Sequence, residues 1–65
     1  MNNFNKKIKV NYVKNHGTDE AVPAVIIGHF IEMDDKFLTM KYDNSNDIFK
    51  ININAIVTIS EVRYQ

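Results

Sequence analysis

The chain has 65 residues, no cysteine, and eight basic against eight acidic residues, so its formal net charge is zero. A chain of this length forms one domain at most, and a domain this small buries only about 60% of its unfolded surface. The absence of cysteine excludes disulfides. The zero net charge excludes the overall positive electrostatic field that a non-specific nucleic-acid binder has. We therefore expect residues 1–65 to form a single, marginally stable domain that gains stability by self-association.

Isoleucine, valine, phenylalanine and tyrosine dominate the apolar residues, which favours strands over helices. No apolar run approaches the roughly 20 residues needed to span a bilayer. The first four residues lack the hydrophobic segment of a signal peptide. The sequence therefore predicts a cytoplasmic protein with no membrane contact.

Charge is unevenly distributed along the chain. Residues 1–16 carry four lysines and no acid, whereas residues 17–48 carry seven acids against two lysines. Two interpretations are open, namely ordinary solvated surface charge and a local basic strand that contacts phosphate.

The first strand is expected over residues 7–12, where polar and apolar side chains alternate. This alternation places Ile8, Val10 and Tyr12 toward the interior. The polar residues 1–5 before it are expected to be frayed, and residues 15–20 have the composition of a loop.

Residues 24–33 are the most apolar stretch and have two interpretations. Apolar residues at helical spacing favour a helix over residues 22–37. Against a helix, Val25, Ile26 and Ile27 are β-branched, and Gly28 would cost about 1 kcal/mol in a helix interior. In a strand, Gly28 marks a bend or bulge, so we favour the strand. A strand that is apolar on both faces indicates strong curvature or burial in a subunit contact.

The following residues read as a hairpin and a long loop. Residues 34–36 form a tight polar break, and residues 37–42 resume as a strand. Residues 43–47 are all turn-formers and predict a loop.

The last part of the chain completes a five-strand pattern. Apolar and polar residues alternate over 49–53, a 3₁₀ turn is expected over 54–56, and the final strand covers 57–62. Five short strands without a long helix predict a mostly β fold, namely a small, closed or nearly closed barrel of the SH3-like or Sm-like type.

The middle and end of the chain, about residues 24–60, resemble Sm-like proteins, including the Hfq-type RNA chaperones. Gly28 is followed six residues later by Asp34 at a hairpin, which is similar to the first motif of that family. The run 54–59, Asn-Ala-Ile-Val-Thr-Ile, is similar to the second motif, with Asn54 at the place of the family's RNA-contacting histidine. The resemblance implies RNA binding. The longer loop over residues 15–23 is closer to that of an SH3-type domain, in which this loop helps to bind protein.

No residue pattern indicates catalysis or a cofactor. His16 and His29 lie on different elements and have no cysteine partner, so a metal site is not expected. The acids Glu32, Asp34 and Asp35 cluster at a hairpin tip, where they are solvated rather than convergent in a cleft. We therefore expect no enzyme, no metal and no cofactor.

Two sets of contact residues follow from these patterns. Lysines interleaved with tyrosines resemble a stacking platform for single-stranded nucleic acid, or a partner surface. This set comprises Lys7, Lys9, Tyr12, Lys14, Lys41, Tyr42 and Asn54. Alternate residues of the central apolar strand are candidates for an oligomer contact, namely Val25, Ile27, His29 and Ile31.

The leading hypothesis is a non-catalytic binding module that acts through protein–protein contacts with an unidentified partner, as a homo-oligomer. A small accessory protein of a phage or mobile element fits this size. Two alternatives stay open, namely an Sm-like protein that binds single-stranded RNA and a binder of a small ligand at a subunit interface.

Overall fold

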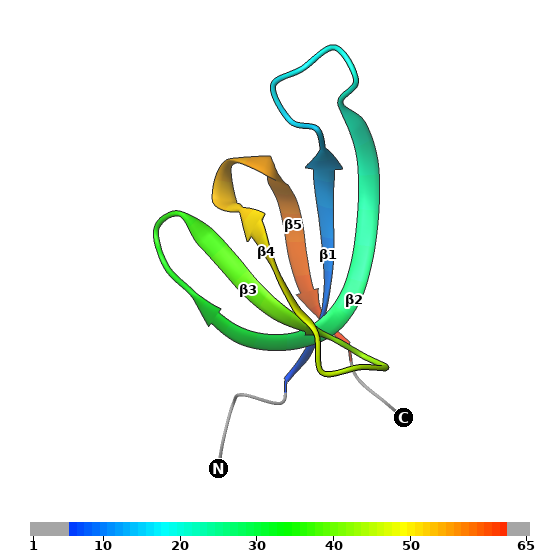
Figure 1. Cartoon of the computed structure of the whole chain (residues 1–65), viewed down its shortest axis with the longest axis vertical. Coiled ribbons are helices and arrows are strands. Elements are labelled where there is room, and N and C mark those ends of the chain that lie inside the picture. The colour runs from blue at the N-terminus through cyan, green and yellow to red at the C-terminus, as the bar shows by residue number, and fades with distance from the viewer. Residues whose placement is uncertain (1–5, 63–65) are drawn as a thin grey trace.

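The computed structural model describes residues 6–62, so the expectation for residues 1–5 falls outside the described part. Within it, five strands form one antiparallel sheet in the order β4-β3-β2-β1-β5 (Figure 1). The bounds are Lys7–Lys14 for β1, Val22–Met33 for β2, Phe37–Tyr42 for β3, Ile48–Asn52 for β4, Ile53–Ala55 for the 3₁₀ turn η2, and Ile56–Glu61 for β5. The mostly β, five-stranded class predicted from the sequence is confirmed.

The central strand β2 decides the architecture. The strand interpretation of this segment is confirmed, and the alternative of a helix over residues 22–37 is wrong. β2 pairs with β1 from Val22 to His29 and with β3 from Gly28 to Met33. Its register with β3 shifts between Phe30 and Glu32, and the strand curves around the interior (Figure 1). One strand therefore belongs to both walls of the fold.

The β1–β2 ribbon extends further than the alternation predicted, since Lys14 lies opposite Val22. Pro23 lies in the first half of β2, which has no β3 neighbour, so the proline interrupts no ladder on that side. The connecting loop uses left-handed backbone at Asn15 (φ 57°) and Gly17 (φ 87°). Asparagine and glycine tolerate this conformation better than other residues.

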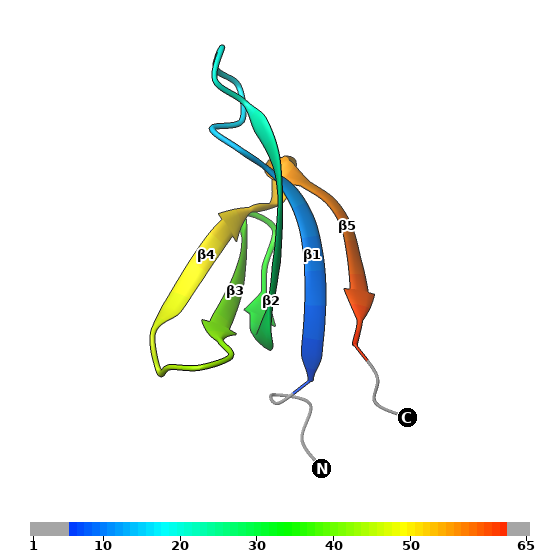
Figure 2. The ribbon, with the colours of Figure 1, turned by 90° about the vertical axis from the view of Figure 1, so that its right-hand side faces the viewer.

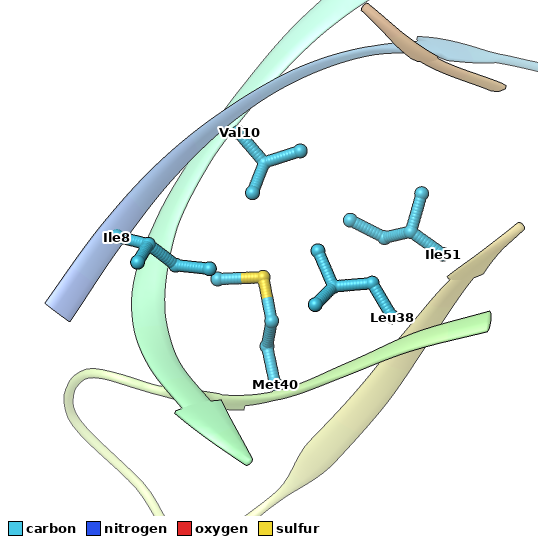
Figure 3. Packing of buried hydrophobic residues seen from close by; sticks show 5 residues of the cluster. All are labelled: Ile8, Val10, Leu38, Met40 and Ile51. Atoms are coloured by element: carbon cyan, nitrogen blue, oxygen red, sulfur yellow. The ribbon is translucent and has the colours of Figure 1, made fainter. Parts of the chain in front are cut away.

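The core is small and aliphatic. Ile8 and Val10 from β1, Leu38 and Met40 from β3 and Ile51 from β4 point toward one another between the strands (Figure 3). Val10, Leu38 and Met40 have 0% exposure. These residues occupy alternate positions on their strands, so the period-two pattern specifies the buried face.

The 3₁₀ turn begins one residue earlier than expected, at Ile53. Asn52 rather than Asn54 provides the cap, because its side-chain oxygen accepts a hydrogen bond from the backbone N–H of Asn54 at 2.8 Å. The backbone N–H of Ile53 donates to the carbonyl of Lys36 at 2.9 Å. This bond fastens the turn to the β2–β3 hairpin.

The barrel is not closed by hydrogen bonds, because the outermost strands β4 and β5 do not pair with each other within residues 6–62. In Figure 2 the sheet folds over, with β1 and β5 forming one wall, β3 and β4 the other, and β2 running between the two. The open sides leave hollows between the walls. The described residues contain no helix that is long and apolar enough to cross a membrane.

Candidate functional site

An open groove of about 500 Å³ lies between the end of β1, the start of the β1–β2 loop, β4 and η2. We call it the aromatic groove. Its lining comprises three aromatic residues (Tyr12, Tyr42, Phe49), three basic residues (Lys14, His16, Lys50), two amides (Asn15, Asn52) and four aliphatic residues (Val13, Ile26, Ile51, Ala55).

The aromatic rings of the groove come from three strands. The rings of Tyr42 on β3 and Phe49 on β4 have centroids 4.5 Å apart and an interplanar angle of 40°. Tyr42 is exposed, while Phe49 and Tyr12 are half-buried and pack against the core. The core therefore fixes two of these rings, and the third, Tyr42, is exposed to solvent.

The charge of the groove has one sign. Lys14 on β1, Lys50 on β4 and His16 in the β1–β2 loop all line it and are exposed. Among the described residues no carboxylate lines it. The Lys50 amine also lies over the Phe37 ring, 5.8 Å from its centroid. A groove lined by cations in a neutral chain raises the local concentration of anions.

The structure brings together Tyr12, Lys14 and Tyr42 of the contact set expected from the sequence. Lys9 is exposed on β1, opposite Ile27, and does not line the groove. Asn54 lies on η2 and is also outside the lining.

The two remaining lysines of that set are engaged at the other end of the sheet. Lys7 forms an ion pair with Asp43, with 3.1 Å between Nζ and Oδ2. The Lys41 amine donates to the carbonyls of Tyr42 and Ser45, at 3.3 and 3.1 Å, and thereby braces the β3–β4 loop. These two lysines have a structural role in the fold.

Sequence reasoning did not include the other polar residues of the groove in the contact set, namely Asn15, His16, Lys50 and Asn52. Lys50 and Asn52 alternate with apolar residues, so the sequence pattern predicts only that their side chains are exposed to solvent. Because β4 is an edge strand, side chains from both of its faces reach the groove. The signal that was available is the proximity of Lys50 to Phe49 in the sequence.

The residues predicted for an oligomer contact lie at alternate positions of β2. Val25 and Ile27 are 56% and 44% exposed, respectively. Ile31 is half-buried, and the ring of His29 contacts Asp43, with 2.9 Å between Nε2 and Oδ1. The exposed apolar part of this face is therefore its first half.

Asp43 connects three elements, because its carboxylate contacts Lys7 on β1 and His29 on β2 and follows directly after β3. The hydrogen bond from Lys7 is the largest cause that lowers the pKa of Asp43 below its ordinary value of 3.8. The pKa of Asp34 is also lowered, mainly because the backbone N–H of Phe37 donates a hydrogen bond to its carboxylate and, to a smaller extent, because that of Lys36 does so too. Both carboxylates are therefore more stable as anions in the folded chain.

These lowered pKa values predict acid sensitivity. Each carboxylate contributes stability above its unfolded pKa of about 3.9, and this is lost as the pH falls through the lower folded value. We expect Asp43→Asn to lower the Tm at pH 7, and the difference from the parent to shrink at pH 3. Circular dichroism melts at the two pH values measure this. Asp19→Asn, which alters an exposed loop carboxylate, is the control, and an Asp43→Asn deficit that persists unchanged at pH 3 would contradict the assignment.

Comparison of the chain with protein-family models, with curated proteins and with solved structures finds no match. Within residues 6–62, no group of three or more histidine, cysteine, aspartate or glutamate side chains is arranged to hold a metal ion. The groove offers stacking surfaces, cations and amide hydrogen-bonding groups. Groups of these kinds bind ligands through stacking, hydrogen bonds and charge.

Proposed function

We propose that the chain is a non-catalytic binding module whose aromatic groove takes single-stranded RNA. The observation that carries this proposal is the lining of the groove, which combines aromatic rings with Lys14 and Lys50 and includes no carboxylate among the described residues. Single-stranded nucleic acids bind by stacking bases on aromatic side chains and by placing phosphates against cations. A groove with an exposed ring and two lysines meets both needs.

The Sm-like or SH3-like affiliation of the fold is part of the same proposal. The strand order, with β1 between β2 and β5, and the 3₁₀ turn before β5 support it. The groove includes the β1–β2 loop and η2, and in the SH3-type domains that the chain resembles that loop helps to bind partners. A similar fold alone does not specify the ligand, so the proposal of RNA binding rests on the side chains that line the groove.

The experiment is fluorescence anisotropy with labelled U-rich and A-rich single-stranded RNA. Two lysine–phosphate contacts predict a slope of about −1.4 for log K against log[salt], so affinity falls about 25-fold from 20 to 200 mM NaCl. Tyr42→Leu is expected to weaken binding by about 5-fold or more, because a stacked base contributes roughly 1–3 kcal/mol. Tyr42→Phe is the matched control, since it keeps the ring. Absence of binding at 20 mM NaCl, or equal binding by Tyr42→Leu and Tyr42→Phe, would refute RNA stacking in the groove.

A second candidate is a self-associating module that acts through protein contacts. It is favoured by the exposed Val25 and Ile27 on β2 and by exposed apolar residues on the two edge strands, Ile48 on β4 and Val57 on β5. Light scattering after size-exclusion chromatography tests it. A monomer at 100 μM, roughly the range in which weak contacts form, would remove this candidate without affecting the groove.

A further inference from the structure

A second hollow, separate from the aromatic groove, opens between β5 and the turn that joins β2 to β3. It has a volume of about 280 Å³ and is lined by Lys6, Ile8, Phe30, Met33, Leu38 and Ile59. No residue lines both hollows. We call this one the apolar hollow.

The apolar hollow is part of the interior of the unclosed barrel. Ile8 and Leu38 belong to the buried core, whereas Met33 and Ile59 are 53% and 41% exposed. Among the described strands, β5 is an edge strand that pairs only with β1, so its other edge is open (Figure 2). Covering these exposed apolar side chains with an apolar ligand would stabilise the complex by roughly 25 cal/mol for every Å² of surface removed from water.

The polar part of the lining is a single lysine. The carbonyl of Lys6 accepts a hydrogen bond from the backbone N–H of Phe30 at 2.8 Å, which fixes the start of the Lys6 side chain at this hollow. Lys6 is exposed, and among the described residues no acid lines the hollow. An occupant therefore meets apolar side chains within and one cation beside them.

We propose that the apolar hollow binds a small amphiphilic monoanion, namely a medium-chain aliphatic carboxylate, with its chain against Phe30 and Ile59 and its carboxylate near Lys6. A methylene occupies about as much volume as a water molecule, roughly 30 Å³, so the hollow holds on the order of eight to ten carbon atoms. Polar ligands are disfavoured, because the walls offer no further hydrogen-bonding side chains.

The test is titration calorimetry with decanoate against decyltrimethylammonium, below the concentrations at which either forms micelles. We expect decanoate to bind with a Kd of about 10⁻⁴ M, and each methylene removed from the chain to weaken binding by about fourfold. Lys6→Gln should reduce the preference for the anion. Ile59→Trp should fill the hollow and abolish binding, whereas Val57→Trp, an equal change at an exposed position of the same strand, should not.

Three results would overturn the proposal. The first is absence of decanoate binding, which is also the result expected if a second copy of the chain occupies the hollow. The second is equal affinity for decanoate and decyltrimethylammonium, because it would mean that Lys6 does not favour an anionic ligand over a cationic one. The third is decanoate binding that survives Ile59→Trp, which would place the ligand elsewhere. A melt of each variant confirms that it is folded under the conditions of the titration.

Discussion

Gly28→Ala is expected to lower the melting temperature by about 10–20 °C, since overpacking of this kind costs roughly 1–3 kcal/mol. An added Cβ would lie 2.5 Å from the carbonyl oxygen of Lys41 and 3.3 Å from the terminal methyl of Met40. The first of these atoms is backbone in the paired strand β3, so it cannot move aside without breaking the ladder. A domain of this size has a total stability of only about 3–10 kcal/mol, so one such clash removes a large part of it.

The matched control is Gly17→Ala in the β1–β2 loop. Gly17 has φ of +87°, and no atom lies within 4 Å of the position that an added Cβ would take, so alanine bears only the cost of a left-handed conformation, about 1–2 kcal/mol. Thermal melts by circular dichroism should therefore rank Gly28→Ala as the less stable variant. Equal melting temperatures would show that the close approach of β3 to Gly28 is not the constraint.

The strand pattern was predictable because one face of each strand is buried. Ile8 and Val10, and likewise Leu38 and Met40, lie two residues apart and share the core face, so hydrophobic alternation records the fold directly. The helical spacing in residues 22–37 was misleading because β2 carries apolar residues on both faces, with Ile26 and Phe30 against the core and exposed residues such as Val25 on the other. The β-branched run and Gly28 resolved that ambiguity correctly.

Element ends and barrel closure were less predictable. The β1–β2 ribbon continues past Tyr12 because Val13 and Lys14 pair with β2, an interaction that alternation does not record. Closure depends on whether β4 and β5 meet in space. Residues on these strands have the same pattern whether their edges are paired or open.

The candidate site was predictable only in part, because its lysines differ in their partners rather than in their local sequence. Lys7 and Lys14 are both end residues of β1, yet Lys7 pairs with Asp43 at one end and Lys14 lines the aromatic groove at the other. The loop after β3 brings Asp43 to β1, and no local pattern encodes that approach. Tyr12 on β1 and Tyr42 on β3 both line the aromatic groove, and no local pattern encodes that these two residues share one groove.

Reversing both groove lysines, in Lys14→Glu with Lys50→Glu, is expected to weaken RNA binding by at least about 30-fold at low salt. Losing the attraction of each lysine to a nearby phosphate costs about 1 kcal/mol in a high dielectric, and repulsion from each new glutamate adds to this loss. The dependence on salt should also nearly vanish, because each lost lysine–phosphate contact removes about 0.7 from the magnitude of the slope for a single strand. Both side chains are exposed and neither belongs to the core, so the variant should fold.

The control is Lys6→Glu with Lys9→Glu, which changes the net charge from zero to the same negative value. Lys6 and Lys9 are exposed, and neither lines the aromatic groove. If the groove binds RNA, anisotropy titrations will show a large loss for the groove pair and a small loss for the control pair. An equal loss in both pairs would mean that RNA responds to the overall charge of the protein, and the aromatic groove would then not be the binding site.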